Sequence, residues 1–293
     1  MTGIPEFIYH RPASVEEACK LGLDLGEKAR FLAGGTELLV DLKEGRDSAD
    51  HLIALKRIPE LDMISLDKGS LVIGALTTLA DICRSETVRC FLPALCDAIS
   101  DLGSEQIRNQ GTIGGNFCGA VPCADTPPVC IAAGAGMRIS GTGSQRHLPA
   151  SEFFLAPRRS ALEPGELLTA IEIPEQPESS GTSYKRFSLR HGSALAVASV
   201  AVRLVLREEK IAEASVVLGA VAPVPLTTAR CIEVLVGEPP SDDIFRNAGR
   251  IAAEEATPIT DIRGSEGYRR ELVEVLTFRA LKSAVEMAGG GKQ

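Results

Sequence analysis

The sequence predicts an α+β protein, and three changes of pattern along the chain support this. Residues 7–55 alternate strand and helix patterns, and residues 61–173 mix short strands with short helices. Beyond a short polar stretch at residues 176–182, which is the best linker candidate, strand patterns come first and helical patterns follow. We therefore expect one domain over residues 1–176 and a second over residues 183–288.

The N-terminal unit is predicted from a capped helix followed by a strand and a glycine-rich loop. Ser14 caps a helix, with Glu17 reaching back toward its start in a capping box. Residues 29–32 form a short strand that leads into the loop Leu-Ala-Gly-Gly-Thr-Glu-Leu at residues 32–38, and a helix is expected over residues 37–43. Such a loop places backbone N–H groups at a helix start, where the helix dipole favours anions.

A second glycine-rich stretch covers residues 106–116, with the sequence Gln-Ile-Arg-Asn-Gln-Gly-Thr-Ile-Gly-Gly-Asn. Glycine lowers helix stability, so this stretch is expected to be neither a regular helix nor a strand. Successive N–H groups in an irregular turn suit phosphate oxygens. The two loops are about 75 residues apart in the chain, and together they indicate one extended anionic ligand held at two places.

The C-terminal part is predicted to hold three antiparallel strands and then three helices. The strands are expected at residues 183–188, 194–206 and 211–221. In the last helix, residues 265–287, an amphipathic stripe is expected to pack on the sheet, and it consists of Tyr268, Leu272, Val275, Leu276 and Arg279. The basic side chains Arg186, Arg190 and His191 are expected to form a solvated face.

Composition excludes several classes of protein. The formal net charge is −8, which argues against a nucleic-acid-binding protein. No apolar run reaches the length of a membrane span, and the N-terminus lacks the pattern of a signal peptide. The eight cysteines show no paired spacing, which is typical of reduced thiols and predicts a cytoplasmic location.

Three segments resemble the FAD-binding medium subunit of the molybdenum hydroxylases. They are residues 32–38, residues 73–79, and residues 107–116 with Pro122 and Asp125 after them. The family includes the flavin parts of xanthine dehydrogenase, carbon monoxide dehydrogenase and 4-hydroxybenzoyl-CoA reductase. The resemblance implies a two-subdomain FAD-binding fold of the PCMH or vanillyl-alcohol-oxidase type, with FAD between subdomains of about 1–57 and 58–176. The C-terminal domain of three-stranded sheet and helices would cover the flavin end.

The resemblance also implies which residues contact FAD. Thr36 stands where some relatives of the wider fold carry a histidine, so a noncovalent FAD is expected. Asp125 matches a carboxylate that binds the FAD, for which a sugar hydroxyl is the better partner, and Lys185 matches a lysine near the isoalloxazine. Leu102 and Leu168 match apolar positions of the flavin pocket. The complete set is Phe31, Leu32, Ala33, Gly34, Gly35, Thr36, Glu37, Leu38, Leu102, Gly111, Thr112, Ile113, Gly114, Gly115, Asn116, Asp125, Leu168 and Lys185.

Cys118, Cys123 and Cys130 follow the second glycine-rich stretch and could suggest an iron–sulfur cluster. 4-Hydroxybenzoyl-CoA reductase carries such a cluster in this subunit, but on an inserted segment that this chain lacks between Asn116 and Asp125. Three cysteines are also one fewer than the usual four ligands, so we expect them to be small buried residues. No metal site and no catalytic residue are predicted in this chain.

The function that the resemblance implies is electron transfer within a larger complex. A small subunit with 2Fe–2S clusters and a large molybdopterin subunit would be the partners, and the external acceptor is open among NAD, oxygen, ferredoxin and quinone. One alternative is a stand-alone flavin-dependent alcohol oxidase or dehydrogenase of the same wider fold. Another is a flavin-free scaffold, in which the glycine-rich loops only pack.

Overall fold

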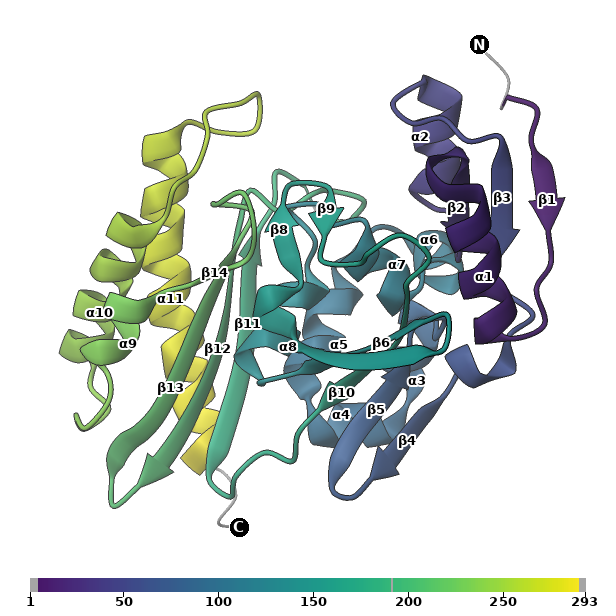
Figure 1. The fold of residues 1–293 in the computed structure, drawn as a ribbon. Coiled ribbons are helices and arrows are strands. Elements are labelled where there is room, and N and C mark those ends of the chain that lie inside the picture. Colours follow the sequence, from purple (N-terminus) through teal and green to yellow (C-terminus); the bar gives the residue numbers. More distant parts are fainter. Residues whose placement is uncertain (1–4, 191, 290–293) are drawn as a thin grey trace.

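Three parallel strands form the N-terminal unit of the fold. The structure, a computed structural model, describes residues 5–190 and 192–289. Strands β1 (Ile8–His10), β2 (Ala29–Leu32) and β3 (His51–Ala54) lie in the order β1-β3-β2, with helices α1 (Val15–Leu25) and α2 (Leu38–Glu44) between them in the chain. Ser14 caps α1 as predicted by accepting from the Glu17 N–H, and Glu17 accepts from the Ala13 N–H. The unit stands at one end of the molecule (Figure 1).

A five-stranded antiparallel sheet forms the second unit. Its order is β4-β5-β10-β6-β7, and its strands are β4 (Ile64–Asp67), β5 (Ser70–Gly74), β6 (Gly136–Gly141), β7 (Ser144–Pro149) and β10 (Leu167–Ile173). Phe117 and Phe153 are fully buried between this sheet and a layer of short helices. Those helices are α3 (Leu79–Arg84), α4 (Glu86–Phe91), α5 (Pro93–Ser100), α6 (Glu105–Gln110), α7 (Ile113–Cys118) and α8 (Thr126–Ala132).

The expectation that residues 106–116 avoid helical structure is wrong. Helices α6 and α7 cover most of the stretch, with Gly111 and Thr112 as the turn between them. Ser104 and Thr112 cap the two helices by accepting from the N–H groups of Ile107 and Gly115. Two good caps offset the low helix propensity of glycine over such short helices.

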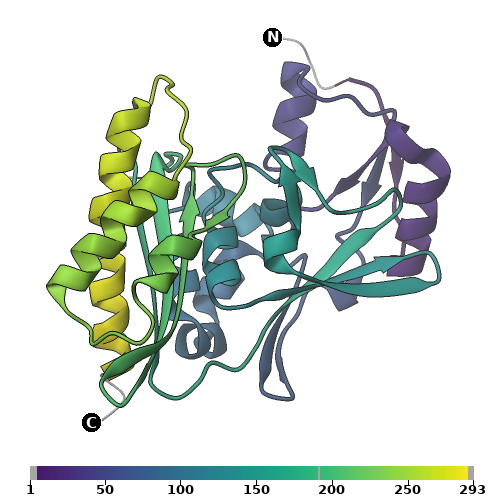
Figure 2. The ribbon, with the colours of Figure 1, turned by 60° about the vertical axis from the view of Figure 1, so that its left-hand side comes forward.

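The C-terminal unit is an antiparallel sheet with helices on its outer face (Figures 1 and 2). Three long strands occur as predicted, β11 (Ser180–Phe187), β12 (Ala198–Arg207) and β13 (Lys210–Gly219), and a two-residue strand, β14 (Leu226–Thr227), adds a fourth member. Helices α9 (Ala229–Glu233), α10 (Asp242–Glu255) and α11 (Glu266–Gly289) complete the unit. Helices α5 and α8 pack on its inner face, so Tyr184 and Val217 share a core with the second unit.

Helix α11 packs through only part of the predicted stripe. Leu276 is buried and Leu272 packs against the core as predicted. Tyr268 and Val275 are 39% and 45% exposed, whereas Arg269, Val273 and Ala280 are buried. Helix α11 lies very close to β11, because a Cβ built on Gly181 of β11 would overlap with the Ala284 carbonyl oxygen of the helix. This close approach requires glycine at position 181.

Smaller elements complete the fold. A short hairpin of β8 (Phe154–Ala156) and β9 (Arg159–Ser160) packs on the second unit, and 3-10 turns occur at Gly26–Lys28, Pro59–Leu61 and Ala150–Glu152. Among residues 5–190 and 192–289, no helix has the length and apolar character needed to cross a membrane.

Candidate functional site

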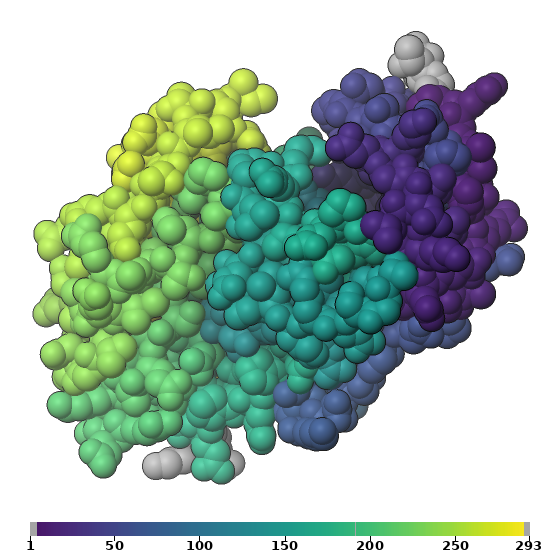
Figure 3. Space-filling model, in the orientation of Figure 1, coloured from purple at the N-terminus to yellow at the C-terminus, as the bar shows by residue number. Residues whose placement is uncertain are grey.

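A cleft lies where the N-terminal unit meets the helices of the second unit. It consists of two adjoining cavities of about 520 and 470 Å³, which share Thr36, Glu37, Leu102 and Asn116 among their lining residues. Figure 3 shows the surface hollowed between the purple N-terminal unit and the teal segment of the second unit. Each cavity has the volume of a site for a small molecule or cofactor.

The two glycine-rich loops meet in this cleft. A Cβ built on Gly34 would overlap with the carbonyl oxygen of Gln110 and would lie 3.0 Å from the Cα of Gly111. A Cβ on Gly111 would in turn lie 3.5 Å from the Thr36 hydroxyl oxygen. The two loops are therefore in contact, and the absence of side chains is what allows it. That they hold one extended anionic ligand stays a prediction.

The first loop presents unpaired backbone donors. Across the part of the chain that the structure describes, the N–H groups of residues 34–37 donate to no protein acceptor. Gly35 has a φ of +72°, a conformation that glycine adopts without strain. All four residues line the first cavity. Consecutive free N–H groups of this kind form a concavity for anions.

The second loop uses its backbone N–H groups in hydrogen bonds within the protein and contributes open space to the cavity. The N–H groups of Ile113 and Gly114 donate to the carbonyl oxygens of Thr77 and Ala75 at 3.1 and 2.9 Å, and the N–H of Gly115 donates to the Thr112 hydroxyl at 3.1 Å. The two adjacent glycines differ in their surroundings. A Cβ on Gly114 would lie 2.6 Å from the Ala75 carbonyl oxygen, whereas a Cβ on Gly115 would meet only the Thr112 hydroxyl at 3.0 Å. Gly115 therefore leaves its open face to the cavity.

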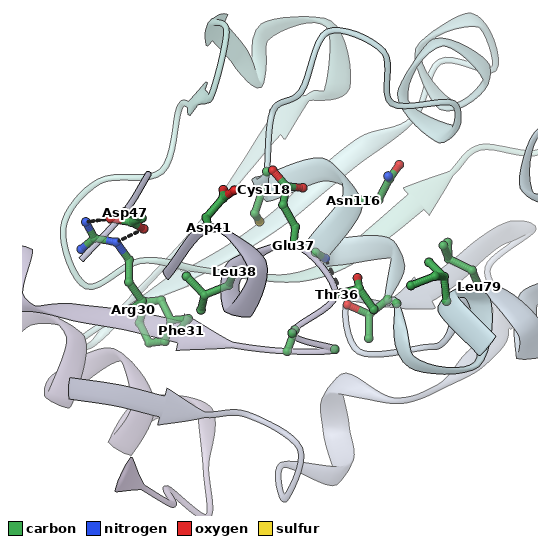
Figure 4. Close-up of a pocket in the computed structure, with 18 of the residues that line it drawn as sticks. Arg30, Phe31, Thr36, Glu37, Leu38, Asp41, Asp47, Leu79, Asn116 and Cys118 are labelled. Atoms are coloured by element: carbon green, nitrogen blue, oxygen red, sulfur yellow. Dashed lines mark hydrogen bonds and ion pairs between the residues drawn. The ribbon is translucent and has the colours of Figure 1, made fainter. Parts of the chain in front are cut away.

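Charged side chains in the first cavity are paired with one another. Arg30 holds Asp47 at 2.8 Å at one end of the cleft (Figure 4). Asp41, which is 5% exposed, is held at 2.7 Å by both Arg46 and Arg158. Burial alone would raise the pKa of Asp41, but hydrogen bonds from Arg158 and Arg46 outweigh it and lower that pKa. The arginines are engaged in ion pairs, whereas the N–H groups of residues 34–37 have no protein acceptor among the described residues and can donate to an anion.

The pKa of Glu37 is shifted in the opposite direction from that of Asp41. Burial raises the pKa of its carboxyl, and the Arg158 guanidinium at 3.4 Å only partly offsets this. Arg158 contacts both Glu37 and Asp41 from the β8–β9 turn, where its φ is +60°. Sequence reasoning missed this bridge between the first and second units, because no spacing signal connects residue 158 to residues 37 and 41. It likewise missed further lining residues, namely Arg30, Arg46, Asp47, Leu79, Ile107, Cys118 and Gly119.

Asp125 lines the second cavity and belongs to a buried network. Its Oδ1 accepts from the Tyr184 hydroxyl at 2.6 Å, and its Oδ2 accepts from Arg186 at 2.9 Å. Burial raises the pKa of Asp125 to about 6, against the opposing effects of Arg186 and Tyr184. The expectation that Arg186 is solvated is wrong, because its side chain is 4% exposed. His191 of the same predicted cluster lies outside the described residues.

Arg186 ties together the walls of the second cavity. Besides Asp125, it donates to the carbonyl oxygens of Asp101 at 3.0 Å and Ala194 at 2.6 Å. Asp101 precedes the lining residue Leu102, and Ala194 itself lines the cavity. One guanidinium from the C-terminal sheet therefore positions three segments of the cleft.

The remaining predicted residues divide into two groups. Phe31, Ala33, Leu38 and Thr112 line the first cavity together with the residues described above. Five others lie away from the lining. Leu32 packs near Leu42 and Leu52, Ile113 and Gly114 are buried behind Gly115, Leu168 is a core residue of the central strand β10, and Lys185 acts electrostatically on Asp97. Successive side chains of a strand point to opposite sides, so Lys185 does not follow Tyr184 and Arg186 toward Asp125.

The three cysteines after the second loop lie in different surroundings. Cys118 lines the first cavity, Cys123 lines the second, and Cys130 is buried in the core. Burial raises the pKa of both Cys118 and Cys130 to about 12. Within residues 5–190 and 192–289, no cluster of three or more histidine, cysteine and acidic side chains could hold a metal ion.

The cleft fits the FAD that the sequence led us to expect. The free N–H groups of residues 34–37 match a pyrophosphate, which is anionic and has no proton to donate. The open face of Gly115 is a place that a side chain would fill, and the second cavity continues past Leu102 to the apolar side chain of Leu195. Two joined cavities also suit a ligand that is longer than either.

Known proteins are similar to this chain over nearly its whole length. Residues 5–176 match the family described as the FAD binding domain in molybdopterin dehydrogenase, and residues 182–284 match the CO dehydrogenase flavoprotein C-terminal domain. The glyceraldehyde dehydrogenase medium chain of Sulfolobus acidocaldarius is 34% identical over 278 residues, which are 95% of this chain and 98% of that protein. The xanthine dehydrogenase FAD-binding subunit of Escherichia coli O157:H7 is 29% identical, with 97% and 98% of the two chains covered.

Solved structures show the same similarity in three dimensions. A chain of the reconstituted CO dehydrogenase from Oligotropha carboxidovorans superposes with a TM-score of 0.94 at 33% identity, covering 98% of this chain and 100% of that one. A chain of quinoline 2-oxidoreductase from Pseudomonas putida 86 gives a TM-score of 0.92 at 29% identity, with 98% and 99% covered.

Proposed function

The chain belongs to the family of FAD-binding medium subunits of the carbon monoxide and xanthine dehydrogenases, and on this premise we propose that it transfers electrons between iron–sulfur clusters of a partner subunit and an external acceptor. Membership makes it an FAD-binding oxidoreductase subunit of a multi-subunit complex. The route of the electrons and the identity of the partner subunits are our proposal.

The observation that carries the proposal is the contact of the two glycine-rich loops in the cleft. The N–H groups of residues 34–37 would hold the pyrophosphate, and Gly115 would leave room beside it. Asp125, which Arg186 and Tyr184 hold in place, retains acceptor capacity for a sugar hydroxyl of the ligand. Leu102 would supply an apolar contact between the two cavities. When bound, FAD supplies the redox chemistry, and the chain binds and orients it.

The proposed partners are a small subunit with 2Fe–2S clusters and a large molybdopterin subunit. Two observations support this. Several relatives are named as the medium chain of a dehydrogenase, and a medium chain implies smaller and larger partner chains. The charged side chains that line the first cavity are also engaged in ion pairs with one another, so among the described residues of that cavity none is a free acid–base pair for substrate oxidation. The FAD is proposed to be noncovalent, because Thr36 lines the cavity where a histidyl attachment would need a histidine.

Two further expectations remain predictions. The boundary between the FAD-binding domain and the C-terminal domain is proposed at residues 176–182, although β11 already begins at Ser180. A cytoplasmic location is proposed from the cysteines, all eight of which are free thiols in the structure.

Anaerobic stopped-flow spectroscopy of the complex and of the isolated chain tests the proposal. Co-purifying chains are first sequenced, and the complex is then mixed with glyceraldehyde, carbon monoxide and xanthine, which the names of the relatives suggest. We expect the flavin absorbance to bleach rapidly in the complex with its own substrate and to stay unchanged in the isolated chain. Equally fast bleaching of the isolated chain by that substrate, or by a panel of alcohols, would instead identify a stand-alone flavin dehydrogenase.

A further inference from the structure

Two cysteines outside the cleft lie against each other near the surface of the second unit. Cys83 is at the end of α3 and Cys96 is in α5. The Cys83 sulfur lies 3.7 Å from the carbonyl oxygen of Cys96, and the Cys96 sulfur lies 3.9 Å from the carbonyl oxygen of Ile82. Each thiol therefore reaches the backbone of the other helix, and both side chains are only half-buried. This arrangement leaves the pair open to a small reagent.

The two thiols have unequal acidity. The Cys96 side chain is the largest cause of a lowered pKa at the Cys83 thiol, where its effect outweighs that of burial. The guanidinium groups of Arg108 and Arg89 lower it further. Arg89 is fixed there because its Nε donates to the Cys83 carbonyl oxygen at 2.7 Å. The pKa of Cys96 is raised instead, by the same contact and by burial, so Cys96 keeps its proton.

We propose that Cys83 and Cys96 form a peroxide-sensitive dithiol that closes to a reversible disulfide between α3 and α5. The Cys83 thiolate attacks one oxygen of hydrogen peroxide, the O–O bond breaks, and hydroxide leaves to take up the proton that Cys83 released. The product at Cys83 is a sulfenic acid. The Cys96 sulfur then attacks the Cys83 sulfur, the S–S bond forms, the S–O bond breaks, and the oxygen leaves as water with the Cys96 proton. In sum, two thiols and one peroxide give one disulfide and two waters.

Other cysteines of the described chain lack this combination of partner and access. Cys118, Cys130 and Cys231 have pKa values that burial raises to about 12, which disfavours the reactive thiolate. Cys90 is exposed in α4 and lies between the pair in sequence, which makes it the natural control. The position of the pair also links it to the cleft, because α3 begins at Leu79 and α5 is followed by Leu102, both of which line the first cavity.

Peptide mapping of the purified full-length chain after titration with hydrogen peroxide tests the proposal. Trypsin releases Cys83 in the peptide 69–84, whereas Cys90 and Cys96 fall together in the peptide 90–108. Free thiols are alkylated before digestion, and the experiment is run on the wild type and on Cys90→Ser. We expect the two peptides to be joined in both proteins, with a loss of two hydrogen atoms, and to separate again after dithiothreitol. A linkage that disappears in Cys90→Ser, or thiols that stay fully alkylated after peroxide is consumed, would overturn the proposal.

Single-cysteine variants test the two roles. In Cys96→Ser, which keeps the size of the side chain, the sulfenic acid has no resolving thiol and should be trapped at Cys83 by dimedone. In Cys83→Ser, Cys96 should remain an unreacted thiol at the same peroxide dose. Circular dichroism confirms that both variants are folded. Dimedone labelling of Cys96 in Cys83→Ser, with none of Cys83 in Cys96→Ser, would refute Cys83 as the attacking residue.

Discussion

The carbonyl oxygen of Gln110 occupies the place where a side chain of residue 34 would have to begin. This contact joins the first glycine-rich loop to the turn between α6 and α7, although the two are about 75 residues apart in the chain. Gly34 is therefore required for close approach and not for a special backbone conformation. The cleft exists because two backbones come within contact of each other.

Replacing Gly34 with alanine should lower both stability and FAD retention. The added methyl group meets backbone atoms of Gln110 that cannot move independently, and such overpacking costs about 1–3 kcal/mol. Urea unfolding and the flavin content of the purified protein measure the two effects. Gly136→Ala is the control, because a Cβ there has no neighbour within 4 Å. A Gly34→Ala protein with wild-type stability would contradict the contact.

The adjacent glycines of α7 should respond differently to alanine. Gly114→Ala places a methyl group against Ala75 and should destabilise the fold by about 1–3 kcal/mol. Gly115→Ala meets only a hydroxyl oxygen and removes a helical glycine, so its free energy of unfolding should be unchanged or higher by up to about 1 kcal/mol. Thermal unfolding of the two FAD-free variants measures this difference in stability. Equal destabilisation of both variants would be inconsistent with the described packing.

The Asp125 network should be costly to break from its cationic side. Arg186→Ala leaves a buried carboxylate without its counter-ion, and the expected loss is about 3–5 kcal/mol. Tyr184→Phe removes one hydrogen bond to a charged group and should cost about 1.5–3 kcal/mol. A double-mutant cycle in urea measures the coupling between these two partners of Asp125. Additive losses would mean that the three residues do not act as a unit.

Asp261 should make the protein sensitive to acid. Burial would raise its pKa, but hydrogen bonds from Arg263 and from the buried Arg269 outweigh it, so the folded pKa lies well below the ordinary 3.8. As the pH falls below about 4, the unfolded state takes up this proton first, so the stability that Asp261 contributes is complete above that pH and is lost below it. Asp261→Asn should cost about 3–5 kcal/mol at pH 7 and show a shallower loss between pH 5 and pH 3. Urea unfolding measures the free energy of unfolding of both proteins across this range. An equal loss with falling pH in the two proteins would rule out this role of Asp261.

The sequence predicted those parts of the fold and the cleft that depend on local signals. The capping residue Ser14, the helix after the first glycine-rich loop and the three long C-terminal strands all occur close to their predicted positions. Each depends on side-chain periodicity or on residues within one turn of each other. Glycine content pointed to both loops, and the family resemblance added Asp125, which also lines the cleft.

Long-range pairs could not be predicted in the same way. Arg158 pairs with Asp41, which is 117 residues away in the sequence, and Arg186 pairs with Asp125, which is 61 residues away. No periodic pattern in the sequence connects the members of either pair. Part of the α11 stripe was misplaced because Arg269, a charged residue, occupies the buried face and donates to two carbonyl oxygens and to Asp261. Helical α6 and α7 were missed because their two caps outweigh the low helix propensity of the two glycines in α7.

Titration of the FAD-free chain with FAD tests the central claim, that one noncovalent FAD lies in the cleft against Gly115. Quenching of flavin fluorescence is followed for the wild type, for Gly115→Val, which fills the cavity, and for Gly267→Val, which changes a helical glycine with no neighbour within 4 Å. We expect the wild type and Gly267→Val to saturate at one FAD per chain, which acid precipitation releases completely, and folded Gly115→Val to show no saturation. Saturation of Gly115→Val at one FAD with wild-type affinity, or flavin that stays in the acid pellet, would contradict the account.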